Sequence, residues 1–326
     1  MDHYCMLNNT PVLLLVFNRP FTTAKVFEAI KKARPGKLFV AADGPREGRN
    51  ESELCAEVRS IATKVDWPCE VHTLFRETNL GSGRAVSAAI SWFFDHVEQG
   101  IILEDDCLPD MSFFEFCDIL LDKYAETKEI MSISGTNLLP AGWKSEKQSY
   151  FFSHGGIWGW ATWKRAWNLF EYDMPEWKNK ANKDKIRRAM NSHNWFDYFS
   201  GMFDDAYQGR SDIWDLQWFY CILNNGGLCI NPSCNLVKNI GFGPGATHTG
   251  DTNGPYANLV IKQMAFPLKH PTKIKIDKKY LSDSYSFIIG YNKSFISLTK
   301  YWIMLYLNRL KTYLSKLIEE SDGKKD

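Results

Sequence analysis

The chain opens with an apolar run at 11–17, Pro-Val-Leu-Leu-Leu-Val-Phe, which ends at Asn18, Arg19 and Pro20. A short run without polar alternation, closed by turn-forming residues, is typical of a strand buried on both faces. Such strands belong to parallel sheets, because helices cover both faces of those sheets. The start of the chain therefore predicts a parallel sheet in an α/β protein.

The same pattern recurs at regular spacing. Further strands are expected at 37–42, 70–75, 100–104 and 129–134, and helices at 22–32, 51–64, 84–96 and 112–125. This alternation predicts a doubly wound, Rossmann-like sheet, mostly parallel, with right-handed crossovers and helices on both faces. The ligand site of such a sheet lies beyond the carboxyl ends of its strands.

Polar groups stand where three of these strands end: Asn18 and Arg19, then Asp43, then the acids Glu104, Asp105 and Asp106. We expect them to lie on one rim of the sheet, because the topology brings the strand ends together. Adjacent carboxylates are costly to desolvate, and a hard divalent cation such as Mg²⁺ or Mn²⁺ is their usual neutraliser. The alternative is a solvated acidic turn after an ordinary strand.

The pattern changes after residue 135, where the chain becomes rich in loops and aromatic residues. We expect a helix at 162–169, a charged amphipathic section at 183–207, a helix starting near 211, and short strands at 228–231 and 235–238. A glycine-rich segment at 241–251 suits a lid over a ligand, or an idle surface loop. The section 294–320 is amphipathic and basic, and either lies in a membrane interface or packs as a helix on protein.

Composition narrows the classes of function that the protein can have. The net charge of +1 over 326 residues argues against a nucleic-acid binder, and 12 tryptophans suit the apolar faces of sugar rings. The eight cysteines show no zinc spacing and are expected to be reduced thiols. No basic and apolar leader is visible at the amino terminus, so we expect a cytoplasmic protein.

Several segments together resemble the metal-dependent GT-A glycosyltransferases, most closely the N-acetylglucosaminyltransferase that starts complex N-glycan branching and bacterial sugar transferases of similar layout. The matching segments lie within about 11–250: 11–19, Asp43-Gly44, 103–106 with Pro109-Asp110, 113–115 and 132–135. The resemblance implies a GT-A fold and transfer of a hexosyl or N-acetylhexosaminyl group from a UDP-sugar, with inversion, to a glycan or lipid-linked acceptor. It also implies a nucleotide-sugar half at 1–135, an acceptor half at 136–260 and a carboxyl-terminal extension at 261–326.

The resemblance also implies roles for residues of the nucleotide-sugar half. Asp106 would bind the metal, while Glu104 and Asp105 would bind donor hydroxyls and metal-bound water. Asn18 and Arg19 would begin the nucleotide pocket, and Asp43 would accept from the uracil ring. Arg84 could meet the diphosphate at the amino terminus of a helix, or be an ordinary surface arginine.

Inverting transfer needs a base for the acceptor hydroxyl. Asp215 in Trp214-Asp215 matches a Trp-Asp-Asp-Trp segment of the family, with Asp212 as the second candidate; an N-cap role is the alternative for either acid. Trp158 and Trp160 would wall the substrate pocket, and His248 would approach the diphosphate or be an exposed loop histidine.

The absence of a visible anchor, together with section 294–320, suggests a bacterial enzyme that builds surface polysaccharide or lipopolysaccharide at the inner face of the cytoplasmic membrane. Two other functions stay open. A sugar-nucleotide nucleotidyltransferase shares a related fold, but its glycine-rich signature does not follow the first strand. A non-catalytic carbohydrate- or partner-binding protein would leave the acid block without a purpose.

Overall fold

The computed structural model describes residues 10–140, 147–242 and 256–292. The chain forms two compact units, Met1–Leu281 and Ser282–Asp326, and each is described by itself. Within the described part of the second unit, residues 282–292 belong to α9 (Lys278–Asn292), which begins in the first unit. The division expected at residues 135 and 260 stays a prediction.

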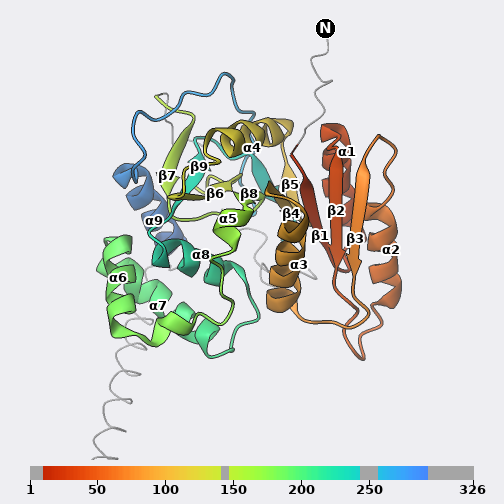
Figure 1. The fold of residues 1–326 in the computed structure, drawn as a ribbon, viewed down its shortest axis with the longest axis horizontal. Helices are drawn as coiled ribbons and strands as arrows, with labels where there is room; N and C mark the ends of the chain where they lie inside the picture. The colour runs from red at the N-terminus through yellow and green to blue at the C-terminus, as the bar shows by residue number, and fades with distance from the viewer. Residues whose placement is uncertain (1–9, 141–146, 243–255, 293–326) are drawn as a thin grey trace, which may run out of the picture. The chain divides into compact units, whose positions relative to one another are not determined.

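The first unit is built on an eight-stranded sheet with the order β3-β2-β1-β4-β8-β6-β9-β7 (Figure 1). Its strands are β1 (Val12–Val16), β2 (Lys37–Ala42), β3 (Glu70–Phe75), β4 (Gln99–Glu104), β6 (Ile130–Ser134), β7 (Tyr150–Ser153), β8 (Trp160–Trp163) and β9 (Leu228–Pro232). Strands β3, β2, β1 and β4 run parallel, as do β6 and β9, whereas β8 and β7 run antiparallel to their neighbours. The expected mixed α/β fold with a mostly parallel sheet is confirmed.

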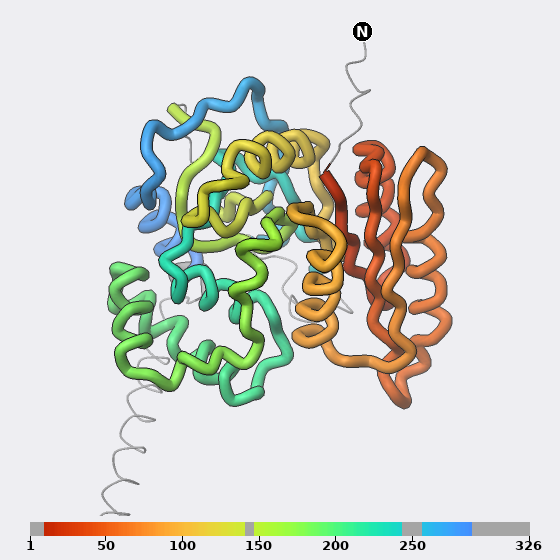
Figure 2. Tube along the Cα trace, viewed as in Figure 1, coloured from red at the N-terminus to blue at the C-terminus, as the bar shows by residue number. Residues whose placement is uncertain are grey.

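Helices cover both faces of this sheet, and the two apolar layers follow from the strand period. In β1, Val12 and Leu14 face one layer and Leu13 and Leu15 the other, and all four are buried. The first layer is covered by α1 (Pro20–Ala33), α2 (Ser52–Ala62) and α4 (Met111–Lys123). The second is covered by α3 (Ser82–His96), α5 (Lys164–Trp167) and α8 (Asp215–Asn224), as the trace in Figure 2 lets the reader follow.

A helical subdomain packs beside α8 in the second half of this unit. It consists of a 3₁₀ helix, η1 (Pro175–Lys178), followed by α6 (Lys180–Met190) and α7 (His193–Tyr207). Rings of η1, α7 and α8 pack edge to face. The ring centroids of Trp177 and Phe203 are 5.1 Å apart, and those of Phe199 and Phe219 are 4.9 Å apart. This packing fixes α7 against α8, and with it the residues that α7 presents to the site.

The expected helix at 162–169 is wrong in its first part. Residues Trp160–Trp163 form β8, which runs antiparallel between β4 and β6, and the helix is limited to Lys164–Trp167. The side chains of Trp160 and Trp163 are buried in opposite layers, and the hydroxyl of Thr162 donates to the carbonyl of Met131 at 2.6 Å. Burial on both faces, rather than helix propensity, therefore decides the conformation of this short segment.

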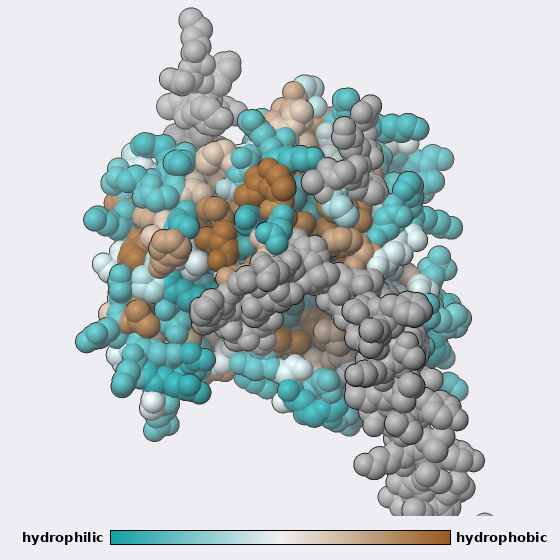
Figure 3. Space-filling model, turned by 180° about the vertical axis from the view of Figure 1, so that it is seen from behind, coloured by the Kyte–Doolittle hydropathy of each residue, from teal (hydrophilic) through white to brown (hydrophobic). Residues whose placement is uncertain are grey.

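On the face shown in Figure 3, hydrophobic residues gather toward the middle and hydrophilic residues surround them. Among the described residues, Phe21 is the most exposed large hydrophobic side chain at 73%, and the Nζ of Lys25 lies 4.0 Å from its ring centroid.

None of the helices in the described ranges has the length and hydropathy needed to cross a bilayer. Section 294–320, the candidate for membrane contact, lies outside the described residues.

Candidate active site

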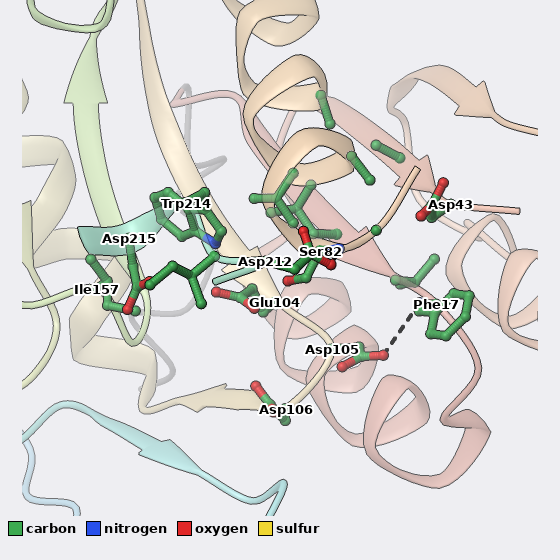
Figure 4. Close-up of a pocket in the computed structure, with 18 of the residues that line it drawn as sticks. Phe17, Asp43, Ser82, Glu104, Asp105, Asp106, Ile157, Asp212, Trp214 and Asp215 are labelled. Atoms are coloured by element: carbon green, nitrogen blue, oxygen red, sulfur yellow. Dashed lines mark hydrogen bonds between the residues drawn. The ribbon is translucent and has the colours of Figure 1, made fainter. Parts of the chain in front are cut away.

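A cavity of about 550 Å³ opens beyond the carboxyl ends of β1, β2 and β4, where the sequence places the polar groups. Among the predicted site residues, its lining includes Asn18, Arg19, Asp43, Glu104, Asp105, Asp106, Trp158, Asp212 and Asp215. The close-up in Figure 4 shows Glu104 between two ends, with Asp215 and Ile157 on one side and Asp43 and Phe17 on the other. The parallel strand ends and the start of α8 thus bring together side chains that are nearly 200 residues apart in sequence.

The acid block lies in a turn between two strands. Strand β4 ends at Glu104, and β5 (Cys107–Pro109) pairs antiparallel with β10 (Val237–Asn239). The N–H of Ile240 donates to the carbonyl of Asp106 at 2.7 Å, which ties the chain after β10 to the acid turn. Space here is tight, because a side chain at Gly241 would meet the carboxylate of Asp106.

Arg19 is the counter-ion of this turn. Its guanidinium pairs with the Asp105 carboxylate and, through Nη1, with the Asp106 carboxylate at 2.9 Å. Burial alone would lower the pKa of Arg19, but the two carboxylates outweigh burial and raise it. Arg19 therefore stays charged and balances two of the three adjacent acids.

No cation among the described residues pairs with Glu104 in a comparable way. Burial and the charges of Asp106 and Asp215 raise the pKa of Glu104 to about 8. Burial likewise raises the pKa of Asp105, to about 6, although Arg19 opposes that rise. Asp215 lies opposite Glu104 at the start of α8, directly after the buried Trp214. The middle of the cavity is therefore rich in carboxyl oxygens.

Asp212 has a structural role that the sequence did not indicate. Its carboxylate accepts hydrogen bonds from the N–H groups of Ser82 and Gly83, both at 2.8 Å, in the first turn of α3. It therefore caps a helix 130 residues earlier in the chain, rather than its own. Because these bonds occupy the carboxylate and neutralise the helix terminus, Asp215 is the better placed of the two candidate bases.

Two predicted residues, Arg84 and Trp160, do not line the cavity, and a third lies outside the described residues. The guanidinium of Arg84 pairs with Asp173 at 3.2 Å and stacks on Tyr172, away from the cavity. Trp160 is 1% exposed and packs in the core. His248 lies outside the described residues, as does most of the glycine-rich segment at 241–251.

Asp43 is held firmly at the far end of the cavity. Its carboxylate accepts from the N–H of Leu80 at 3.0 Å and from that of Gly44 at 3.0 Å. Burial raises the pKa of Asp43, and these hydrogen bonds oppose the rise. Arg59 fixes the neighbouring backbone, because its Nη2 donates to the carbonyls of Asp43 and Arg76.

Several lining residues were not predicted from the sequence. Arg76 interacts with Asp43, Asn79 donates to the carbonyl of Gly44, and Arg46 lies over the ring of Phe17, while Phe199 and Met202 belong to α7, where Phe199 packs on Phe219 of α8. Arg76 directly follows a predicted strand, so the rule that located Asp43 could have found it. No sequence pattern indicated Phe199 and Met202. Both belong to α7, whose position depends on tertiary contacts with α8 rather than on the order of the strands.

The acid block has the donor atoms that a divalent metal requires, but not a full set of ligands in the described part of the chain. Glu104, Asp105 and Asp106 offer only oxygen donors, the type that Mg²⁺ and Mn²⁺ prefer. In the described ranges, however, no three Asp, Glu, His or Cys side chains are grouped closely enough to hold an ion by themselves. Within the described residues, the acid block therefore supplies oxygen donors of the right type but not a complete set of metal ligands.

No family model and no curated protein matches this chain. Solved structures with a similar fold include HddC from Yersinia pseudotuberculosis, at 8% identity and a TM-score of 0.29, covering 48% of this chain and 77% of that one. Inositol-1-phosphate CTP transferase from T. maritima is 10% identical, with a TM-score of 0.28 and coverage of 50% and 74%. UDP-glucose pyrophosphorylase in complex with UDP-glucose is 12% identical, with a TM-score of 0.25 and coverage of 45% and 63%. Likeness at TM-scores of 0.29 or less does not identify what this chain binds or does.

Proposed function

We propose that the protein is a metal-dependent glycosyltransferase that moves a hexosyl or N-acetylhexosaminyl group from a UDP-sugar to an acceptor hydroxyl, with inversion. The observation that carries this proposal is the division of charge along the cavity. Arg46 and Arg76 line the end that holds Asp43, whereas the end that holds Asp215 has no cation among its described lining residues. The two ends therefore suit two substrates of different charge, one anionic and one neutral.

The cationic end suits a nucleotide. The ring of Phe17 offers an apolar surface, and the Arg46 guanidinium lies 5.3 Å from its centroid. Arg46 is itself oriented by Glu51, which also accepts from the Asn18 amide at 3.0 Å. A carboxylate such as that of Asp43 accepts from a base N–H, and arginines attract phosphate. These residues together support a nucleoside diphosphate in this half of the cavity.

The acidic middle suits glycosyl transfer. Asp215 would accept the proton of the acceptor hydroxyl as its oxygen forms a bond to C1 of the donor sugar. The bond from C1 to the diphosphate oxygen breaks in the same step, and the electron pair leaves with the nucleoside diphosphate. Glu104, with its raised pKa, would donate a hydrogen bond to a sugar hydroxyl and thereby position the ring.

Mn²⁺ or Mg²⁺, when bound with the donor, would stabilise the charge of the leaving diphosphate. Asp106 is the residue of this chain best placed to ligate it. Arg19 would keep Asp105 and Asp106 in position and balance their charge while no metal is bound.

A sugar-nucleotide nucleotidyltransferase is the second candidate, and the names of two of the similar structures belong to that class. Such an enzyme joins a sugar phosphate to a nucleoside triphosphate and releases pyrophosphate, and all three are anionic. Asp215 would repel a phosphate group at the end where the described lining offers no arginine or lysine to balance it. The charge division therefore favours the glycosyltransferase over this alternative.

The proposal is tested by a panel of UDP-, GDP- and CMP-sugars, with and without Mn²⁺. We expect one UDP-sugar to raise the melting temperature in a metal-dependent way and to be slowly hydrolysed to UDP. Asp106→Ala should abolish both effects, whereas Asp122→Ala, an exposed acid on α4, should change neither. Pyrophosphate release from UTP and a sugar 1-phosphate would support the nucleotidyltransferase instead, and stabilisation by none of the ligands would support a binding protein.

We further propose a biological setting for this activity. The product would be a surface polysaccharide or lipopolysaccharide, made at the inner face of the cytoplasmic membrane and contacted through section 294–320. Co-sedimentation with anionic vesicles tests this contact. Equal recovery of the full chain and a chain ending at residue 292 in the vesicle pellet would contradict it.

A further inference from the structure

The end of the cavity that holds Asp215 has an apolar wall, formed by Ile157, Trp158, Phe199, Met202 and Leu216. Three segments build it: the loop before β8, α7 and the start of α8. In Figure 4, Ile157 and Trp214 stand beside Asp215, across Glu104 from Asp43. The apolar wall is thus on the side of the acid block that faces away from the nucleotide end.

Helix α7 presents two side chains to this wall. Phe199 and Met202 are three residues apart and lie on the same side of the helix. Phe199 is held in place by ring contacts with Trp195 and Phe219, each with centroids 4.9 Å apart. Met202 also lines the cavity and is 39% exposed. An exposed thioether and a ring held in place, both lining one cavity, are suited to contact with a ligand.

Charge limits what this wall can contact. The arginines of the described lining are all committed elsewhere: Arg19 pairs with the acid turn, Arg46 with Glu51, and Arg76 interacts with Asp43. On this side of the cavity the described lining contributes the acids Asp215 and Glu104, and no arginine or lysine. A phosphate there would meet carboxyl groups without a compensating cation, which is unfavourable in a partly buried cavity.

We infer that the acceptor is an uncharged glycoside whose sugar ring lies with its C–H face on Phe199 and Met202, rather than a sugar phosphate or lipid-linked phosphate. This inference rests on the proposed glycosyltransferase function and adds the class of its second substrate. Phe199 and Met202 are then residues that determine acceptor specificity. The apolar ring face replaces water at the wall, while a ring hydroxyl reaches Asp215.

Binding measurements test the inference without knowledge of the natural acceptor. The full chain, saturated with UDP and Mn²⁺, is titrated with phenyl glycosides of glucose, galactose and N-acetylglucosamine, and with the corresponding sugar 1-phosphates. We expect at least one phenyl glycoside to bind and to bind more tightly than its phosphate counterpart. Phosphates that bind more tightly, or no binding of either series, would overturn the inference.

Substitutions in α7 test whether this helix contacts the acceptor. Met202→Gln and Phe199→Ala should weaken glycoside binding roughly tenfold, as expected for the loss of a buried apolar contact, while the Kd for UDP stays unchanged. Met202→Lys should shift the preference toward the sugar 1-phosphate. Leu169→Gln removes an apolar side chain that is 47% exposed and does not line the cavity, and should change neither affinity. An equal loss of UDP affinity in the Met202 variant would place α7 at the donor and contradict the inference.

Failure of the proposed function gives a different result. If UDP does not bind to the wild type with Mn²⁺, the nucleotide proposal fails and the acceptor inference fails with it. If UDP binds tightly but the glycosides do not, only the acceptor inference is lost. Thermal unfolding of each variant shows whether the chain remains folded.

Discussion

The carboxylate of Asp212 lies against Gly83, whose N–H donates to Oδ1 of Asp212 at 2.8 Å. This contact joins the segment before α8 to the first turn of α3 across 129 residues of sequence. Both segments line the cavity, so the contact fixes the distance between its two walls. The approach is possible because residues 81 and 83 are glycines, and Gly81 also has a positive φ of 81°.

Gly83→Ala should therefore destabilise the protein strongly. The added Cβ would lie 2.1 Å from the Tyr172 hydroxyl and 2.7 Å from the carbonyl of Ile213, a backbone atom that cannot rotate away. We expect a loss of roughly 2–3 kcal/mol in the free energy of unfolding, measured by chemical denaturation. Gly201→Ala is the matched control, because Gly201 in α7 has nothing within 4 Å of the added Cβ. That control should gain up to about 1 kcal/mol from helix propensity, and equal losses in both variants would contradict the explanation.

Substitutions of the two candidate bases should separate structure from catalysis. Asp215→Asn should lower kcat by roughly 10²- to 10⁴-fold, the usual contribution of a general base, with little change in the UDP affinity. Asp212→Asn keeps one acceptor oxygen for the first turn of α3, and should cost about 1 kcal/mol of stability while leaving kcat within roughly tenfold. Steady-state kinetics and denaturation of both variants test this. A larger loss of kcat for Asp212→Asn, without loss of stability, would reverse the assignment.

The parallel half of the fold could be predicted from the sequence because β1, β2 and β4 are apolar runs closed by a polar turn, and β3 follows at the same spacing. Strands β2 and β3 have the predicted bounds, and β1 differs by one residue at each end. The position of Asp43 and of the acid block followed from the same rule, since strand ends of a parallel sheet converge on one rim.

The second half of the fold could not be predicted from local sequence patterns, because long-range contacts determine its structure. Strand β8 is only four residues long, and its conformation depends on burial between β4 and β6. The family resemblance implied that Trp160 lines the pocket, but alternation along β8 turns its side chain into the core. Likewise, the role of Asp212 depends on Gly83, and no local pattern around 212 indicates a helix terminus so far away in sequence.

Arg19→Gln should destabilise the protein because it leaves two acids without their counter-ion. Asp105 is almost fully buried, and Arg19 is its only ion-pair partner among the described residues. We expect a loss of roughly 2–4 kcal/mol, measured by denaturation at neutral pH, since removal of one member of a buried pair exposes the full desolvation cost of the other.

Mn²⁺ should restore part of this stability, and by more than it stabilises the wild type, because a divalent cation can replace the guanidinium. Arg210→Gln breaks an exposed pair with Asp205 and should cost less than about 1 kcal/mol, with no dependence on Mn²⁺. Equal effects of Mn²⁺ on wild type and Arg19→Gln would show that Arg19 is not the resident counter-ion of the acid block.

His154, directly after β7, should make stability depend on pH. Its side chain is buried, and burial lowers the pKa of His154 from 6.5 to about 4. The unfolded chain binds a proton near pH 6.5 that the folded protein does not bind until about pH 4, so stability is full above pH 6.5 and falls as the pH drops to 4. We expect the loss in this window to be roughly 3 kcal/mol.

Glu104, with its raised pKa, changes stability with pH in the opposite direction, so the wild type should be compared with His154→Gln. The variant should lack this loss, whereas His193→Gln, an exposed residue at the start of α7, should retain it. Parallel stability curves for wild type and His154→Gln between pH 4 and 7 would show that the buried imidazole is not the source.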